Sequence, residues 1–191
     1  MKKRIIRCND SDSDDDDDEK VMTVHNNVYF YCRVTRKTSL QLNTKLEEVQ
    51  QIILNHKIQE NEINLYIQSG GGELFAGISS MNYIENMKVH VNTIVDGFVA
   101  SAASLIILGG HTVYMQKHAT LLIHQMTTGF YGKFEEFMDE VHNSKKSMKM
   151  IKDIYKDKTK IPEKELEKLM KKDIYLDVNE CKKYKIIHKI C

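Results

Sequence analysis

Ser101 lies among very small residues at the border between two contrasting segments. Residues 97–104 read Gly-Phe-Val-Ala-Ser-Ala-Ala-Ser, after a β-branched run at 90–95 and before an apolar run that ends in two glycines. These patterns predict a strand, then a helix that stops at the glycines. A serine at such a turn lies beside unpaired helix N–H groups, which favour a negative charge. That arrangement is typical of a serine nucleophile and its oxyanion, although the same small residues also suit close helix packing.

Two further segments could supply the rest of a hydrolytic site. Residues 64–67 predict a buried strand that runs into Gln68, Ser69 and the three glycines 70–72, which present bare backbone N–H groups. A flexible turn or a phosphate cradle would look similar, but the Lys-Ser/Thr pair of a phosphate-binding loop is missing. Residues 120–125 form a short apolar run that places His124 at its end, where an imidazole can act as a general base. A buried structural histidine is the alternative for His124.

In order and spacing, these segments resemble the proteolytic subunit of the Clp protease, a self-compartmentalising serine peptidase. Residues 66–72, Tyr-Ile-Gln-Ser-Gly-Gly-Gly, match the family's Tyr-Ile-Asn-Ser-Pro-Gly-Gly, and residues 97–103 match its Gly-Gln-Ala-Ala-Ser-Met-Gly. Residues 123–126, Ile-His-Gln-Met, match Ile-His-Gln-Pro, and residues 172–176, Lys-Asp-Ile-Tyr-Leu, match Arg-Asp-Arg-Phe-Leu. The resemblance runs from about Val28 to the C-terminus. It implies an α/β crotonase-like fold of repeated ββα units with a protruding handle helix.

The resemblance also implies a role for each of five positions. Ser101 would be the nucleophile, His124 the general base, and Asp173 the acid that orients the imidazole. The backbone N–H groups of Gly72 and Ala102 would form the oxyanion hole. These are the candidate site residues that the structure must bring together.

Several positions depart from the family pattern without removing a triad group. Gln68, Gly70 and Met126 replace an asparagine and two prolines, and the stretch between serine and histidine is two residues shorter, near residues 109–111. Asp177 is a rival for the third triad position, but it falls where the family has a serine. We expect these departures to affect substrate preference and rate more than the chemistry.

Residues 127–132, Thr-Thr-Gly-Phe-Tyr-Gly, resemble the family's Gly-Gly-Tyr-Gln-Gly, where the handle that joins two rings begins. The resemblance implies heptameric rings, stacked in pairs around a chamber, that cut unfolded polypeptides. It implies a partner AAA+ unfoldase of the Clp ATPase type, and no cofactor on the subunit itself. Two other classes stay open: an inactive ring subunit or scaffold, and an acyl-CoA enzyme of the crotonase fold.

Charge is distributed unevenly along the 191 residues, although the formal net charge is only +1. Residues 10–19 are almost entirely acidic, whereas the C-terminal third is rich in lysine. Because like charges at that density repel, we expect residues 1–26 to be an acidic disordered tail and residues 27–191 to be one peptidase domain. The lysines alternate with acids and lack an aromatic–basic motif, so no nucleic-acid partner is expected.

The cysteines indicate the redox environment of the protein but no metal or disulfide site. Cys8, Cys32, Cys181 and Cys191 show neither metal-ligand spacing nor a disulfide framework. No hydrophobic stretch reaches membrane-spanning length, and the charged N-terminal segment lacks a signal-peptide apolar region. We expect a cytoplasmic or organellar location, a reducing environment, and no membrane or metal partner.

The remaining pattern predicts alternating strands and helices. Strands are expected at residues 28–34, 63–68, 90–96, 112–116 and 120–124. Helices are expected from a capping box at Thr44, at 74–87, from Ala102, at 134–155, and with Pro162 in a first turn. This order suggests βαβ crossovers and a mostly parallel sheet.

Overall fold

Parallel strand pairing dominates the sheet of this chain, whose computed structural model describes residues 21–56 and 61–191. The strands are β1 Met22–Val24, β2 Asn27–Phe30, β3 Glu62–Ser69, β4 His90–Ala100, β5 Thr112–Met115, β6 Thr120–Leu122, β7 Tyr175–Leu176 and β8 Lys189–Ile190. The helices are α1 Arg36–His56, α2 Leu74–Glu85, α3 Ala102–Leu108, α4 Phe134–Lys158, α5 Glu163–Met170 and α6 Val178–Lys183. The strand order is β1-β2-β3-β4-β5-β8, and β6 pairs with both β4 and β7.

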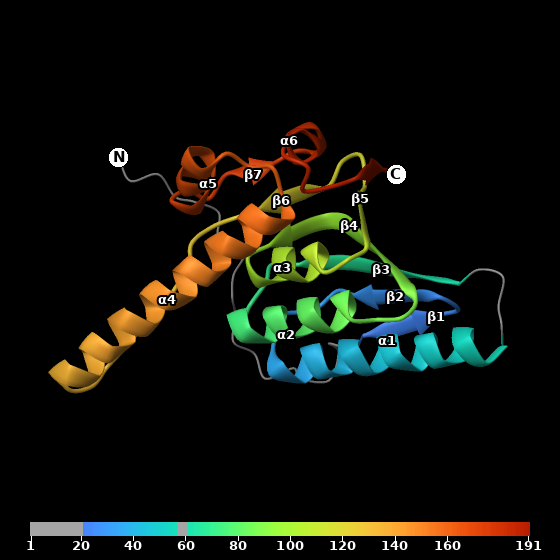
Figure 1. Cartoon of the computed structure of the whole chain (residues 1–191), viewed down its shortest axis with the longest axis horizontal. Coiled ribbons are helices and arrows are strands. Elements are labelled where there is room, and N and C mark those ends of the chain that lie inside the picture. The colour runs from blue at the N-terminus through green and yellow to red at the C-terminus, as the bar shows by residue number, and fades with distance from the viewer. Residues whose placement is uncertain (1–20, 57–60) are drawn as a thin grey trace, which may run out of the picture.

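Three helices link successive parallel strands and cover one side of the sheet. α1 follows β2, α2 follows β3 and α3 follows β4, as the alternating sequence pattern predicts. Figure 1 shows these helices gathered on the same side of the strands. Alternate strand residues, including Val28, Phe30, Leu65 and Ile67, are fully buried there. Burial of such apolar side chains is the main favourable term that holds the layers together.

Strand β4 is the longest, at 11 residues, and its two halves have different neighbours. Residues 92–95 pair with β5, whereas residues 98–100 pair with β6. Gly97 lies between the two halves with φ +83, and the β3–β4 register also shifts there, between Ile67 and Ser69. The fork sets β6 beside the end of β4. Residues that follow β4 and β6 therefore emerge at the same place.

Helix α4 leaves the body of the molecule as an arm (Figure 1). Only Ile151 and Tyr155 among its 25 residues are buried. Large apolar side chains near its other end are exposed: Tyr131, Phe134, Phe137 and Met138. The expected long helix is therefore present, and it extends three residues beyond Tyr155, to Lys158.

Helix α1 corrects one of the sequence predictions, because it begins at Arg36 and not at Thr44. Thr35 is the residue that caps it: the Thr35 hydroxyl accepts a hydrogen bond from the Thr38 N–H at 3.1 Å, and the Thr38 hydroxyl accepts one from the Thr35 N–H at 2.9 Å. The apparent capping box lies inside the helix. There the Glu47 carboxylate accepts hydrogen bonds from Gln51 and the Tyr83 hydroxyl instead.

The N-terminal boundary of the folded domain also differs from the expectation. Val21 is 6% exposed, and β1 pairs antiparallel with β2 from Met22 to Val24, so the sheet begins before residue 27. Pairing in register with β2 explains how a short segment with exposed side chains joins the sheet. The acidic run 10–19 lies outside the described residues. The first expected strand is shorter than predicted, since β2 ends at Phe30 and Val34 forms only an isolated bridge to Gly72.

Candidate active site

Ser101 occupies the sharp turn between β4 and α3, in a backbone conformation that non-glycine residues rarely adopt. Its φ is 54° and its ψ is −128°. A residue held in such a conformation costs about 1–3 kcal/mol and persists only where its surroundings enforce it. Here the Ser101 N–H donates to the Leu122 carbonyl at 3.1 Å, and the adjacent alanines Ala100 and Ala102 are buried. The turn therefore presents the serine immediately before the first residue of helix α3, as the sequence predicts.

The glycine segment that faces Ser101 is held in place by hydrogen bonds to Val34. The Val34 N–H donates to the Gly71 carbonyl at 2.9 Å, and the Glu73 N–H donates to the Val34 carbonyl at 2.8 Å. Gly71 and Gly72 have φ values of +93° and +149°. A Cβ on Gly71 would lie 2.6 Å from the Ser101 Cβ, and one on Gly72 would lie 2.1 Å from the Val34 oxygen. Both positions therefore require glycine.

Two backbone donors lie in the cavity beside Ser101. Gly72 N–H and Ala102 N–H make no hydrogen bond within residues 21–56 and 61–191. Both residues line one cavity together with Ser101 and His124. Unpaired N–H groups beside a nucleophile are the arrangement that stabilises an oxyanion. The structure thus brings together four of the five residues that the sequence singles out.

His124 and Asp173 are brought together by strand pairing. β6 and β7 are antiparallel, with Leu122 opposite Tyr175. Continued by two residues, the same register sets His124 opposite Asp173. The His124 Nδ1 and Asp173 Oδ1 atoms lie 3.7 Å apart, with side chains 27% and 80% exposed. That separation places the carboxylate near the imidazole but exceeds hydrogen-bond length.

Asp177, the rival acid, has a different role. Its Oδ1 atom accepts hydrogen bonds from the N–H groups of Asn179 and Glu180, both at 2.8 Å, and caps helix α6. The Asp177 N–H in turn donates to the Glu180 carboxylate at 3.0 Å, which completes a capping box. The Asp177 carboxylate is thus hydrogen-bonded to the α6 cap, whereas Asp173 lies 3.7 Å from His124 Nδ1. The structure therefore favours Asp173 over Asp177 beside the imidazole.

The cavity at Ser101 has a volume of about 570 Å³ and is closed on one side by α4. Ile151 and Tyr155 of that helix line it, as do the charged side chains of Arg33 and Glu73. Neither of these α4 residues was predicted from the sequence to belong to the site. Their membership depends on how the arm packs against α3, which no local pattern reports.

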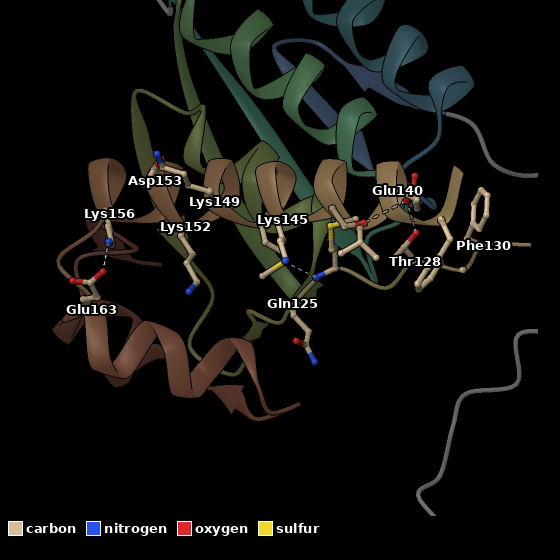
Figure 2. A pocket seen from close by; sticks show the side chains of 16 residues that line it. Gln125, Thr128, Phe130, Glu140, Lys145, Lys149, Lys152, Asp153, Lys156 and Glu163 are labelled. Atoms are coloured by element: carbon tan, nitrogen blue, oxygen red, sulfur yellow. Dashed lines mark hydrogen bonds and ion pairs between the residues drawn. The ribbon is translucent and has the colours of Figure 1, made fainter. Parts of the chain in front are cut away.

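A second groove, of about 650 Å³, runs between α4 and the segment that follows His124 (Figure 2). Lysines from α4 line it, and Lys156 is ion-paired with Glu163 of α5. Opposite, Thr128 donates to Glu140 at 3.0 Å, and the Met126 N–H donates to the Met148 sulfur at 3.4 Å. Met126 lines both cavities, so the groove lies next to the cavity at Ser101.

Two further findings concern the part of the chain that the structure describes. No helix in it is long and apolar enough to cross a membrane. No three or more of its histidine, cysteine and acidic side chains are grouped so that they could hold a metal ion. Of the cysteines in it, Cys32 and Cys181 are buried, whereas Cys191 is exposed.

Comparison with known proteins gives concordant results. A sequence model described as Clp protease matches residues 16–191. The ATP-dependent Clp protease proteolytic subunit of Deinococcus radiodurans is 25% identical over 169 residues, which cover 84% of this chain and 83% of that protein. The structure of a ClpP1 variant from Listeria monocytogenes matches with a TM-score of 0.75 at 23% identity, covering 87% of this chain and 91% of that one. The structural likeness confirms the expected crotonase-like α/β fold.

Proposed function

This chain belongs to the Clp protease family and is a serine peptidase of the proteolytic-subunit type, and on that premise we propose that Ser101, His124 and Asp173 hydrolyse peptide bonds. The observation that carries the proposal is the fork in β4. It sets Ser101 at the end of one strand and His124 just beyond its neighbour, and the β6–β7 register brings Asp173 to 3.7 Å from the imidazole Nδ1.

The reaction follows from these positions. The Ser101 hydroxyl oxygen attacks the scissile carbonyl carbon while His124 Nε2 takes its proton. The oxygen of the tetrahedral intermediate is stabilised by the N–H groups of Gly72 and Ala102. When the intermediate collapses, the C–N bond breaks and His124 returns the proton to the leaving amine. A water molecule then gives a proton to His124 and attacks the acyl carbon; the C–O bond to Ser101 breaks, and His124 returns the proton to the Ser101 oxygen. Asp173 holds the Nδ1–H tautomer and stabilises the imidazolium.

The substrate would be an unfolded segment of polypeptide. Segment 127–131, which leads away from His124, belongs to no strand and borders both cavities. An extended peptide can add to such a free backbone edge, with its side chains entering the neighbouring pockets. A folded substrate has no free extended segment that could pair with residues 127–131. This supports the need for a separate partner that unfolds the substrate.

The subunit would act in an assembly of heptameric rings, stacked in pairs, that a ring-shaped ATPase of the Clp type supplies with unfolded chains. Exposed aromatic residues on the arm support self-association, because apolar surface of this kind usually marks an interface. Tyr131 is fully exposed and Phe134 is 72% exposed. The two other classes, an inactive scaffold and an acyl-CoA enzyme, are not favoured by the family match. We place the protein in a cytoplasmic or organellar, reducing compartment.

The test is covalent labelling of the purified full-length protein with a fluorophosphonate probe, followed by peptide mapping. We expect the adduct on Ser101, hydrolysis of fluorogenic peptides, and a particle mass of many subunits. Ser101→Ala should abolish labelling and hydrolysis together. Ser147→Ala, on the surface of α4, is the matched control and should change neither. A protein that is well folded but neither labelled nor active would refute the proposal.

A further inference from the structure

Tyr155 is a buried tyrosine whose hydroxyl group reaches from the arm helix to the first turn of α3. The residue is 2% exposed, and its hydroxyl oxygen lies 2.5 Å from the Ser104 Oγ atom. Burial raises the pKa of Tyr155 to about 12, so the hydroxyl keeps its proton at neutral pH. Most of α4 is exposed, and this contact is one of the few that fix the helix to the body of the subunit.

The direction of the hydrogen bonds follows from counting protons. The Ser104 Oγ atom also lies 2.5 Å from the Ser101 carbonyl oxygen, which can only accept. Ser104 therefore donates its single hydroxyl proton to Ser101, and Tyr155 must donate to Ser104. The Ser104 N–H adds a second hydrogen bond to the same carbonyl at 3.0 Å. Consecutive hydrogen bonds of this kind polarise and strengthen one another.

The Ser101 carbonyl is one end of a planar peptide unit whose other end is the Ala102 N–H. In a trans peptide the C=O and N–H bonds point in opposite directions, and no cis peptide is found among the described residues. Fixing the carbonyl toward Ser104 therefore directs the Ala102 N–H away from it. Ala102 lines the cavity that also contains His124. The orientation of this peptide unit thus decides where one oxyanion donor points.

We infer that Tyr155 is a positioning residue, which acts through Ser104 to aim the Ala102 N–H at the oxyanion; this inference rests on the function proposed above. The Ser101 backbone is in a sparsely populated conformation, so its peptide unit needs support to stay in place. Two hydrogen bonds to the carbonyl provide that support, and Tyr155 holds the one made by a side chain. Tyr155 does not touch the substrate's reacting atoms.

The experiment compares Tyr155→Phe, which removes one hydroxyl oxygen, with the wild-type protein. Loss of a whole oxyanion donor lowers kcat by about 10²–10³-fold, so we expect a misaimed donor to lower kcat by about tenfold, with KM nearly unchanged. A peptide boronate forms a tetrahedral adduct on the serine, and its affinity should fall by a similar factor. The matched control is Tyr83→Phe, which removes a hydroxyl that donates to Glu47 at 2.8 Å, between α1 and α2. It should leave kcat and boronate affinity unchanged.

Ser104→Ala breaks the same chain at its other link and serves if Tyr155→Phe folds poorly. We expect the two single variants to lose similar activity and the double variant to lose no more than either one. The inference is overturned if both folded variants retain kcat and boronate affinity within twofold of the wild type, even where thermal stability falls. It is also overturned if the losses multiply in the double variant. A wild-type protein without hydrolysis or labelling at Ser101 would instead overturn the proposed function, and the inference with it.

Discussion

Asp173 and Asp177 show how two nearby acids of the same type acquire different roles from their surroundings. Asp173 follows the turn after α5 and faces His124, whereas Asp177 caps α6 through two backbone N–H groups. Sequence comparison alone favoured Asp173, and the cap explains physically why Asp177 is occupied. The strain at Ser101, by contrast, could not be predicted from its side chain, because it depends on β4, β6 and the glycines that surround it.

Asparagine substitutions at these two acids should have opposite consequences. Asp173→Asn removes the acceptor that selects the imidazole tautomer, and we expect kcat to fall by about 10⁴-fold with little change in stability. Asp177→Asn retains a side-chain acceptor for the α6 cap, so activity and stability should both stay near wild type. Steady-state peptide hydrolysis and thermal unfolding of both variants decide the matter. A severe kcat loss in Asp177→Asn alone would reassign the third triad member.

At the scale of elements, buried strands were the most predictable part of the fold. β3 and β4 begin within one residue of their predicted starts, because continuous apolar runs bounded by polar turns indicate buried parallel strands. The predicted start of α1 was wrong, because Thr44 and Glu47 match a capping pattern that lies inside the helix. The true cap is formed by the hydroxyl groups of Thr35 and Thr38. The fork of β4 could not be predicted, because pairing partners far apart in sequence are not encoded locally.

Separate alanine substitutions at Thr35 and Thr44 test the corrected start of α1. Thr35→Ala should lower the free energy of unfolding by about 1 kcal/mol, because the Thr38 N–H loses its cap. Thr44→Ala lies inside the helix and should be close to neutral, since alanine has the better helix propensity. Urea denaturation of both variants gives the comparison. Equal destabilisation at the two positions would contradict the assignment of Thr35 as the cap.

At the scale of the whole molecule, the sheet includes residues 22–24, which the sequence composition had assigned to the tail. β1 covers the outer edge of β2, and Val21 is buried just before it. Deletion of residues 1–20 should therefore leave the melting temperature nearly unchanged. Deletion of residues 1–26 also removes β1 and exposes the edge of β2, which should lower the melting temperature and favour aggregation. Calorimetry of the two truncated proteins measures their melting temperatures. Equal melting temperatures would contradict the assignment of β1 to the folded domain.

The place where the β6–β7 ladder ends has a kinetic consequence. Ladder pairing stops at Leu122 and Tyr175, and beyond it the Gln125 N–H donates to the Met170 carbonyl at 2.8 Å, so the imidazole and the carboxylate lie where inter-strand pairing is sparse. We expect local opening and closing to set the fraction of time for which the two side chains are hydrogen-bonded. If an extended peptide binds nearby and restrains this part of the sheet, His124 and Asp173 should be hydrogen-bonded for a larger fraction of the time. Substrate binding would then help to assemble the catalytic triad. Slower amide hydrogen exchange at Ile174 when a non-cleavable peptide is bound would reveal the effect, and unchanged exchange would argue against it.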